Sequence, residues 1–152
     1  MMSITLNRLL SSVRPIAIEG NADVEITGVE CDSRKVKQGD LFVAVPGVTT
    51  DGHKYIEAVV EAGAAAVVCE HLPENRRAGV AYVQVASSAS ALGHIASEWY
   101  GRPSEQLKLV GVTGTNGKTT TATLLYETAR LAGFKAGLFS TVCNYCLLYT
   151  SD

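Results

Sequence analysis

The chain has 152 residues, of which 47% are hydrophobic and 18% are charged, with a formal net charge of −2. This composition is typical of a globular sequence that can build a core. The length suits one ordinary domain or one and a half small ones. The slight acidic balance disfavours a nucleic-acid-binding surface, which usually carries a basic excess. No apolar run approaches the roughly 18 residues that span a bilayer, and residues 1–19 lack the continuous apolar core of a secretory signal, so we expect a cytoplasmic protein without nucleic-acid or membrane partners.

The first hundred residues alternate between apolar strand patterns and amphipathic helix patterns. We expect a short helix around Leu6 and Leu9, a strand over 24–29, a polar loop over 32–40, a strand over 41–45, a helix from about His53, strands over 64–69 and 80–85, and a helix capped by Ser87 or Ser88. The expected core stripe of that last helix is Leu92, Ile95, Ala96, Trp99 and Tyr100. Residues 101–104 are typical of a linker. The pattern predicts a first α/β domain over residues 1–103.

A second unit begins after this linker, with a strand over 107–113, a glycine-rich turn, a helix from near Thr119 to about Leu131 and a strand over 136–141. In a strand–turn–helix arrangement, the backbone N–H groups of the turn and the helix N-terminus attract phosphate. Lys118 can then reach the β- and γ-phosphates, and the Thr119 hydroxyl can hold Mg²⁺. Val112 stands where the strict phosphate-loop pattern has its first glycine, so the alternative is a glycine-rich turn without a ligand.

The second unit is short for the fold that it begins. A unit of roughly 45 residues buries too little surface to close a doubly wound sheet. A phosphate-loop enzyme also needs a carboxylate from a later strand for its metal ion. We therefore expect residues 107–144 to be the first strand, phosphate loop, helix and strand of a truncated P-loop NTPase-like nucleotide-binding domain.

Three sequence blocks together resemble the Mur ligases, which add amino acids to the peptidoglycan precursor. The blocks are the phosphate loop at 114–120, the Asp32-Ser33-Arg34 triplet with the strand block over 39–45, and Gly47 with Asp51-Gly52-His53. The resemblance covers residues from about 3 to 144 and is to the MurE type, which adds a diamino acid. The MurF type shares much of the N-terminal pattern, but its phosphate loop more often replaces the Thr-Asn pair.

The resemblance implies roles for particular residues. Ser33 would hydrogen-bond the uridine diphosphate part of the substrate, Cys31 would line that site, and a loop would contact the same nucleotide-sugar through Val48, Thr49 and Thr50. ATP would bind to Gly114, Thr115, Asn116, Gly117, Lys118, Thr119 and Thr120, with Lys118 on the phosphates as the catalytic lysine and Thr119 on Mg²⁺. Without the family pattern, Asp32-Ser33-Arg34 is better explained as an Asx-type turn after a strand than as a site, and His53 as a residue of the first helical turn.

The activity implied by the resemblance is ATP-dependent amide-bond formation. A diamino acid, meso-diaminopimelate or L-lysine, would be joined to UDP-N-acetylmuramoyl-L-alanyl-D-glutamate through an acyl phosphate, by a monomeric enzyme that uses ATP and Mg²⁺. The alternatives are another ligase of the family, of the MurF or folylpolyglutamate-synthase-like type, and a non-catalytic nucleotide-binding module. The Asp32-Ser33-Arg34 block disfavours the folylpolyglutamate-synthase-like type, which needs no UDP-binding domain.

The last residues differ from the family pattern. Residues 145–152 contain no counterpart of the paired threonines, acidic strand and modified lysine that the resemblance implies. We interpret this tail as foreign to the protein and expect the fragment itself to be inactive. Cys143 and Cys146 form a CxxC pair, for which a redox or zinc role is the alternative to an accident of sequence at this junction.

Overall fold

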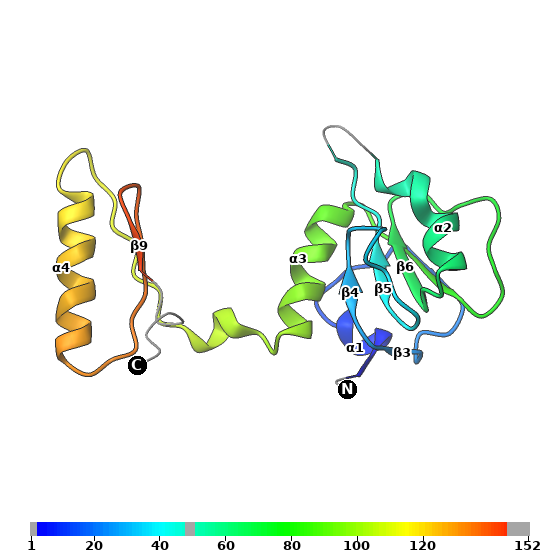
Figure 1. The fold of residues 1–152 in the computed structure, drawn as a ribbon, viewed down its shortest axis with the longest axis horizontal. Helices are drawn as coiled ribbons and strands as arrows, with labels where there is room; N and C mark the ends of the chain where they lie inside the picture. The colour runs from blue at the N-terminus through cyan, green and yellow to red at the C-terminus, as the bar shows by residue number, and fades with distance from the viewer. Residues whose placement is uncertain (1–2, 48–50, 146–152) are drawn as a thin grey trace. The chain divides into compact units, whose positions relative to one another are not determined.

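The computed structural model describes residues 3–47 and 51–145. Contacts within the chain divide it into two units, Met1–Leu107 and Lys108–Asp152, which are described here one at a time. A five-stranded sheet forms the centre of the first unit (Figure 1). Its strands, in spatial order, are β2 (Ala17–Glu19), β7 (Ala81–Gln84), β6 (Ala66–Cys69), β5 (Leu41–Val43) and β4 (Val29–Glu30).

The strands β4, β5, β6 and β7 run parallel, and β2 is antiparallel to β7. Leu41 pairs with Ala66, and Ala66 pairs with Ala81. Because side chains alternate along a strand, this register places matching positions of the three strands on the same face. The three inner strands are apolar at almost every position, which is expected of parallel strands that are covered on both faces. The α/β class and the strands expected near 41–45, 64–69 and 80–85 are therefore confirmed.

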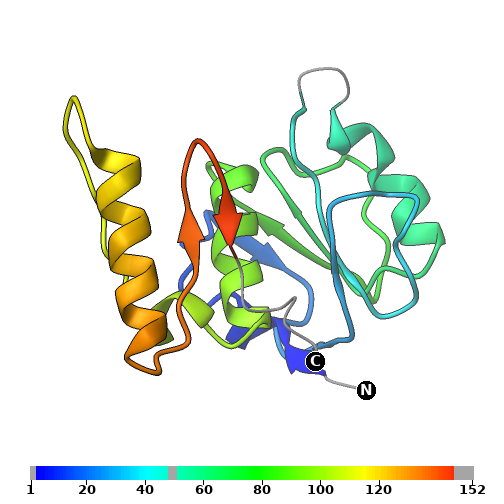
Figure 2. The same ribbon diagram turned by 60° about the vertical axis from the view of Figure 1, so that its left-hand side comes forward.

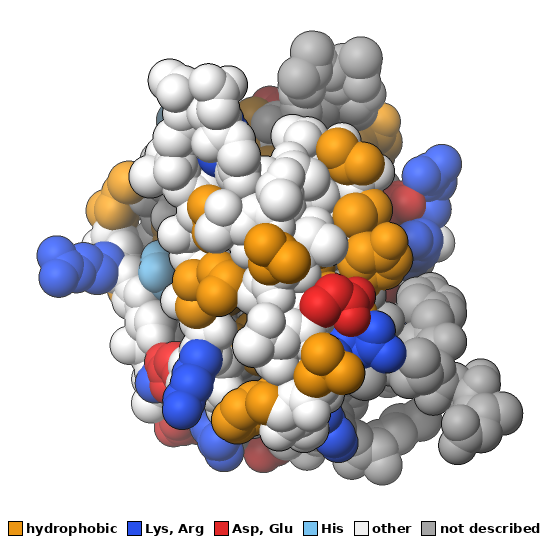
Figure 3. Space-filling model, turned by 90° about the vertical axis from the view of Figure 1, so that its left-hand side faces the viewer, with side chains coloured by type: hydrophobic (Ala, Val, Ile, Leu, Met, Phe, Trp, Pro, Cys, Tyr) orange, Lys and Arg blue, Asp and Glu red, His pale blue; other side chains and the backbone are white. Residues whose placement is uncertain are grey.

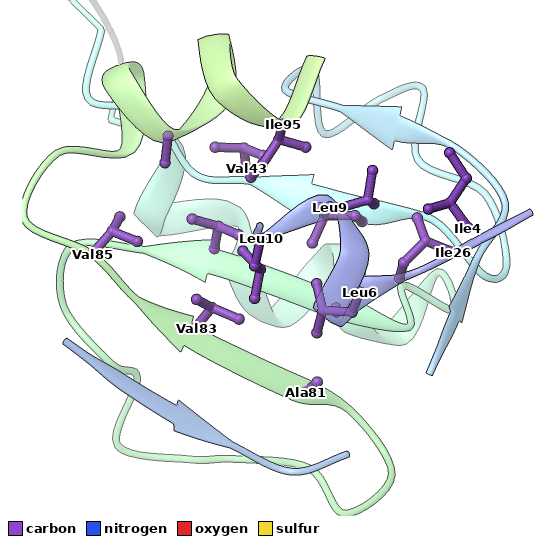
Figure 4. Packing of buried hydrophobic residues seen from close by; sticks show 14 residues of the cluster. Ile4, Leu6, Leu9, Leu10, Ile26, Val43, Ala81, Val83, Val85 and Ile95 are labelled. Carbon is purple, nitrogen blue, oxygen red and sulfur yellow. The ribbon is translucent and has the colours of Figure 1, made fainter. Parts of the chain in front are cut away.

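Helices cover both faces of the sheet. The helices α1 (Leu6–Leu9) and α3 (Ser88–Trp99) pack on the face that carries Val43, Val68 and Val83, together with Ile4 and Ile26 (Figure 4). The helix α2 (Ile56–Glu61) packs on the opposite face, against Phe42, Val67 and Tyr82. The result is a three-layer arrangement with the sheet in the middle, also visible in the turned view of Figure 2.

The helix α3 begins where the sequence predicts. The Ser87 side chain accepts a hydrogen bond from the Ser90 N–H at 3.3 Å, which identifies Ser87 as the N-cap. The buried residues of the helix are Ser88, Ala91 and Ile95, while Leu92 and Trp99 pack at the edge of the core. The expected stripe is thus correct at its centre and wrong at its end, because Tyr100 follows the last helical residue and is 75% exposed.

The expected single strand over 24–29 is wrong. Its first part, β3 (Glu25–Ile26), pairs with β1 (Ile4–Thr5) in a separate two-stranded sheet, and only the segment after Gly28 joins the main sheet as β4. The break lies at Gly28, where a Cβ atom would be 2.5 Å from the Asp40 Oδ1. The chain therefore passes close to this carboxylate at the point where its pairing partner changes from β1 to β5.

The second unit contains the helix α4 (Lys118–Leu131) and a hairpin of β8 (Leu138–Phe139) and β9 (Asn144–Tyr145). The helix and the strand near 136–141 are found where expected. The strand expected over 107–113 is absent: within the described part of the chain this segment pairs with no strand, and Leu109 and Val110 are 83% and 75% exposed. An apolar run becomes a strand only where a neighbouring strand supplies hydrogen-bond partners.

The amphipathic pattern of α4 predicts an inner face of Ala122, Leu125, Tyr126, Ala129 and Gly133. None of these residues is buried, although Ala122, Tyr126 and Ala129 are half-buried. Tyr126 stacks on Tyr145 of the hairpin, with 5.4 Å between ring centroids. Exposed hydrophobic side chains are visible in Figure 3, which looks onto the molecule from the side where Figure 1 shows α4. No helix within residues 3–47 and 51–145 is long and apolar enough to cross a membrane.

Replacing Ile95 with alanine should lower the free energy of unfolding by about 2–5 kcal/mol, because the side chain is fully buried between α3 and the sheet. His94→Ala, at an exposed position of the same helix, should change it by less than about 0.5 kcal/mol. Urea denaturation followed by the fluorescence of Trp99, the single tryptophan, measures both. Equal losses in the two variants would contradict this packing.

Candidate functional site

The first unit has a cavity of about 450 Å³ at the carboxyl ends of β4 and β5. The residues that line it are Cys31, Asp32, Ser33, Arg34, Phe42, Val45, Gly52 and Tyr55. Such a position follows from topology, because loops that leave neighbouring parallel strands diverge at the carboxyl edge of the sheet and leave a crevice. Cys31 and Ser33, which the resemblance assigned to one site, therefore do lie in one cavity.

One side of the cavity is a tight turn directly after β4. The Asp32 Oδ1 accepts the Arg34 backbone N–H at 3.2 Å, which makes this an Asx-type turn. The same carboxylate accepts the Arg34 Nε at 2.9 Å and Nη2 at 2.8 Å, a two-point ion pair. These bonds from Arg34, first from its guanidinium and then from its backbone, lower the pKa of Asp32 from 3.8 to about 2. The turn presents the half-buried Ser33 at its centre, and no protein partner for the Ser33 hydroxyl occurs among the described residues.

The opposite side of the cavity is the 3-10 helix η1 (Gly52–Tyr55). The Gly52 N–H donates to the Val45 carbonyl at 3.1 Å. A Cβ atom at Gly52 would lie 2.9 Å from both the N and the O of Val45. Only glycine allows this close approach, so Gly52 fixes how near η1 lies to the end of β5. Asp51 caps η1 by accepting the His53 N–H at 3.0 Å.

The predicted phosphate loop lies in the second unit, and its seven residues are contiguous at the start of α4. Gly114 and Gly117 have φ values of +144° and +76°, in the region that favours glycine. Lys118, the first helical residue, donates its ammonium group to the Gly114 carbonyl at 2.5 Å and to the Thr115 carbonyl at 3.2 Å. Thr119 is half-buried, whereas the other six residues are exposed. The loop thus keeps its cation close to the first backbone groups of a 14-residue helix.

The structure adds lining residues to the site predicted from the sequence, and it does not describe three of the predicted residues. Val48, Thr49 and Thr50 lie outside the described residues, but their neighbours Val45 and Gly52 line the cavity. The contributions of Phe42, Val45 and Tyr55 to the lining were not predicted, because they depend on how the loops meet in space. Within residues 3–47 and 51–145, no three His, Cys, Asp or Glu side chains form a group that could hold a metal ion.

Comparison with known proteins gives a family match to the first unit and curated relatives that extend over most of the chain. Residues 25–100 match the model described as "Mur ligase family, catalytic domain". The UDP-N-acetylmuramoyl-L-alanyl-D-glutamate–2,6-diaminopimelate ligase of Bacteroides fragilis is 59% identical over 140 residues, and the protein of the same name from Clostridium tetani is 40% identical over 142 residues. Each alignment covers 92% of this chain and 29% of the relative, so the chain spans less than a third of the length of these relatives.

Two solved structures show the same fold. A structure titled as a UDP-N-acetylmuramoyl-L-alanyl-D-glutamate–2,6-diaminopimelate ligase matches 96% of this chain with a TM-score of 0.62 and 25% identity, over 29% of its own length. MurF from Acinetobacter baumannii matches 86% of this chain with a TM-score of 0.60 and 27% identity, over 28% of its own length.

Asp32 should remain ionised until the pH falls close to 2, because its folded-state pKa is depressed from 3.8. The Asp32–Arg34 pair therefore stabilises the turn at every pH above 3.8 and is lost as the pH falls through about 2. Carboxyl ¹³C chemical shifts, followed by NMR during an acid titration, measure this value. Arg34→Gln should move the pKa of Asp32 back towards 3.8, and titration near 3.8 in the unmodified protein would contradict the ion pair.

Proposed function

The chain belongs to the Mur ligase family, and we propose that it supplies the acceptor-binding and ATP-binding elements of an ATP-dependent ligase of peptidoglycan synthesis. In this proposal residues 1–103 bind UDP-N-acetylmuramoyl-L-alanyl-D-glutamate, and residues 107–144 begin the ATP-binding domain. The acceptor receives a diamino acid, for which the names of the relatives favour 2,6-diaminopimelate. The observation that carries the proposal is the cavity between the Asp32–Arg34 turn and η1, inside the region that matches the family.

The cavity suits a nucleoside diphosphate in its chemistry. Tyr55 is 41% exposed and offers an aromatic surface at one side. The Ser33 hydroxyl can both donate and accept hydrogen bonds. Among the described lining residues the only carboxylate is that of Asp32, and its charge is compensated by Arg34 where an anionic ligand would bind. Cys31 adds a small side chain at the same side, and we propose that Val48, Thr49 and Thr50 complete the contacts.

The phosphate loop suits ATP with Mg²⁺. Its two glycines in the left-handed region of φ permit the tight turn, and the N-terminus of α4 favours negative charge. Gly114, Thr115, Asn116 and Gly117 would surround the phosphates, with Thr120 in the first turn of the helix. Lys118 would exchange its two carbonyl contacts for phosphate oxygens, and Thr119 would supply a hydroxyl ligand to Mg²⁺.

The two sites have complementary tasks in the proposed reaction. ATP transfers its γ-phosphoryl group to the free carboxylate of the acceptor, which gives an acyl phosphate and ADP. The amine of the diamino acid then attacks the acyl carbon, which forms the amide and releases phosphate and a proton. Lys118 stabilises charge on the phosphates. The cavity holds the nucleotide end of the acceptor and so restricts where its distant carboxylate can be, which lowers the entropic cost of reaction. We propose that the enzyme acts as a monomer in the cytoplasm.

A MurF-type activity is the second candidate, because the MurF structure from Acinetobacter baumannii shares this fold. The curated relatives at 40–59% identity favour the diaminopimelate ligase instead. A non-catalytic nucleotide-binding module would need neither the cavity nor its Ser33. UDP binding therefore separates the ligase proposals from that module.

Ser33→Ala should weaken UDP binding by about three- to tenfold, the effect of one lost hydrogen bond. Isothermal titration of the 152-residue chain with UDP measures the dissociation constant. Ser12→Ala, at an exposed serine of the same unit, is the matched control and should bind like the unmodified chain. Absence of UDP binding by the unmodified chain, or equal affinity in Ser33→Ala, would count against this site.

Lys118→Met should weaken binding of ATP with Mg²⁺ by about tenfold or more, because a charged hydrogen-bond donor to phosphate is removed. The affinity for UDP should not change. A fluorescent ATP analogue titrated in the presence of Mg²⁺ measures this loss, and Lys135→Met, at an exposed lysine of the same unit, serves as control. If both lysine variants bind the analogue equally well, residues 114–120 are a glycine-rich turn without a nucleotide role.

A further inference from the structure

His53 links η1, which forms one wall of the cavity, to Glu70 at the carboxyl end of the central strand β6. It lies in η1 between Gly52 and Tyr55, which both line the cavity, whereas His53 itself is not a lining residue. Its side chain is only 15% exposed. The ring Nδ1 is 2.7 Å from the Asp51 Oδ1, and the ring Nε2 accepts the Glu70 backbone N–H at 2.9 Å.

These two contacts determine which ring nitrogen carries the proton. A backbone N–H can only donate, so the Nε2 atom that receives it must have a free lone pair. The proton therefore resides on Nδ1, which donates it to Asp51. His53 is a neutral ring with both nitrogens in use, and its Nε2 is not available as a general acid.

Glu70, the residue that His53 contacts, is itself held firmly. It directly follows β6, and its carbonyl accepts the Gln84 Nε2 at 3.0 Å. Its carboxylate accepts the Ser88 N–H at 2.9 Å and the Ser88 hydroxyl at 3.0 Å, at the start of α3. These bonds, first that from the Ser88 backbone, hold the pKa of Glu70 below its ordinary value. The Glu70 N–H is therefore a fixed point, set by β6, β7 and α3 together.

We propose that His53 is a positioning residue of the nucleotide cavity, which holds η1 at the distance from the sheet that the nucleoside diphosphate requires. This inference rests on the proposed function, since it needs the cavity to bind UDP. Without His53, the described contacts between the start of η1 and the sheet edge are the Gly52 N–H to the Val45 carbonyl and the bridge between Pro46 and Asp51. The far end of η1 continues into α2, whose buried Ile56 anchors it, whereas its Asp51 end would keep only these two described contacts, so that end of the wall would move and the ligand would have to order it on binding.

A matched pair of variants separates the two ring contacts. His53→Gln places an amide oxygen near the position of Nε2 and can still accept the Glu70 N–H, whereas His53→Asn places its amide near Nδ1 and can only reach Asp51. Both lose one ring hydrogen bond, so a purely structural role would affect them alike. We expect His53→Gln to bind UDP within about threefold of the unmodified chain and His53→Asn to bind about tenfold more weakly.

Three measurements keep the test decisive. Isothermal titration with UDP gives the affinities, and His71→Ala, at the exposed histidine whose ring lies 6.0 Å from that of His53, should bind like the unmodified chain. Hydrogen exchange should show that the Glu70 amide is protected in the unmodified chain and in His53→Gln, and unprotected in His53→Asn. Imidazole ¹⁵N shifts of the unmodified chain should show a proton on Nδ1 alone.

The outcomes distinguish this inference from the proposed function. No UDP binding by the unmodified chain overturns both. UDP binding that is equal in His53→Gln and His53→Asn, or equally weakened in both, overturns the positioning role and leaves the UDP site standing. If His53→Asn does not fold, a proton found on Nε2 of the unmodified chain, or an unprotected Glu70 amide in a folded His53→Gln, still refutes the role of His53.

Discussion

The parallel ladder of β5, β6 and β7, covered on both faces, is the constraint on which the rest of the first unit depends. Side chains on both faces of these strands enter a core, so almost every position within them must be apolar. Polar groups therefore lie beyond the strands, at their amino ends and at their carboxyl ends. Because the strands are parallel, all of the carboxyl ends meet at one edge, and the cavity and the His53–Glu70 contact both lie there.

Polar side chains have different tasks at the amino ends and at the carboxyl ends of the strands. At the amino end of β5, the buried Asp40 carboxylate accepts the Lys37 N–H at 2.8 Å and the Thr27 hydroxyl at 3.3 Å, while Gly28 makes room for it. The Asp40 carboxylate thus makes its hydrogen bonds to other groups of the protein. At the carboxyl end, the turn that Asp32 organises presents Ser33 to the cavity. Two aspartates eight residues apart therefore have separate roles, one in closing a turn inside the fold and one in shaping the wall of the cavity.

The sequence predicts those elements whose cause is local. The apolar runs near 41–45, 64–69 and 80–85, and the Ser87 cap, are sufficient evidence for the strands and for the start of α3. The alternation over 24–29 is misleading because its two parts pair with different strands, β1 and β5, which come close only in the folded state. In the same way, Cys31 and Ser33 are predictable as a site from the family pattern. The contact of His53 with Glu70 joins residues 17 positions apart and has no local signature.

The second unit shows the same distinction between local and distant causes. The phosphate loop needs two glycines with positive φ and a helix start, all supplied within residues 114–118, and the structure contains them. The preceding segment needs a neighbouring strand to become one, and the described residues offer it none. Because the proposed phosphate recognition would rely on the loop's own N–H groups and on Lys118, its chemistry would be encoded more locally than the sheet on which such loops are usually carried.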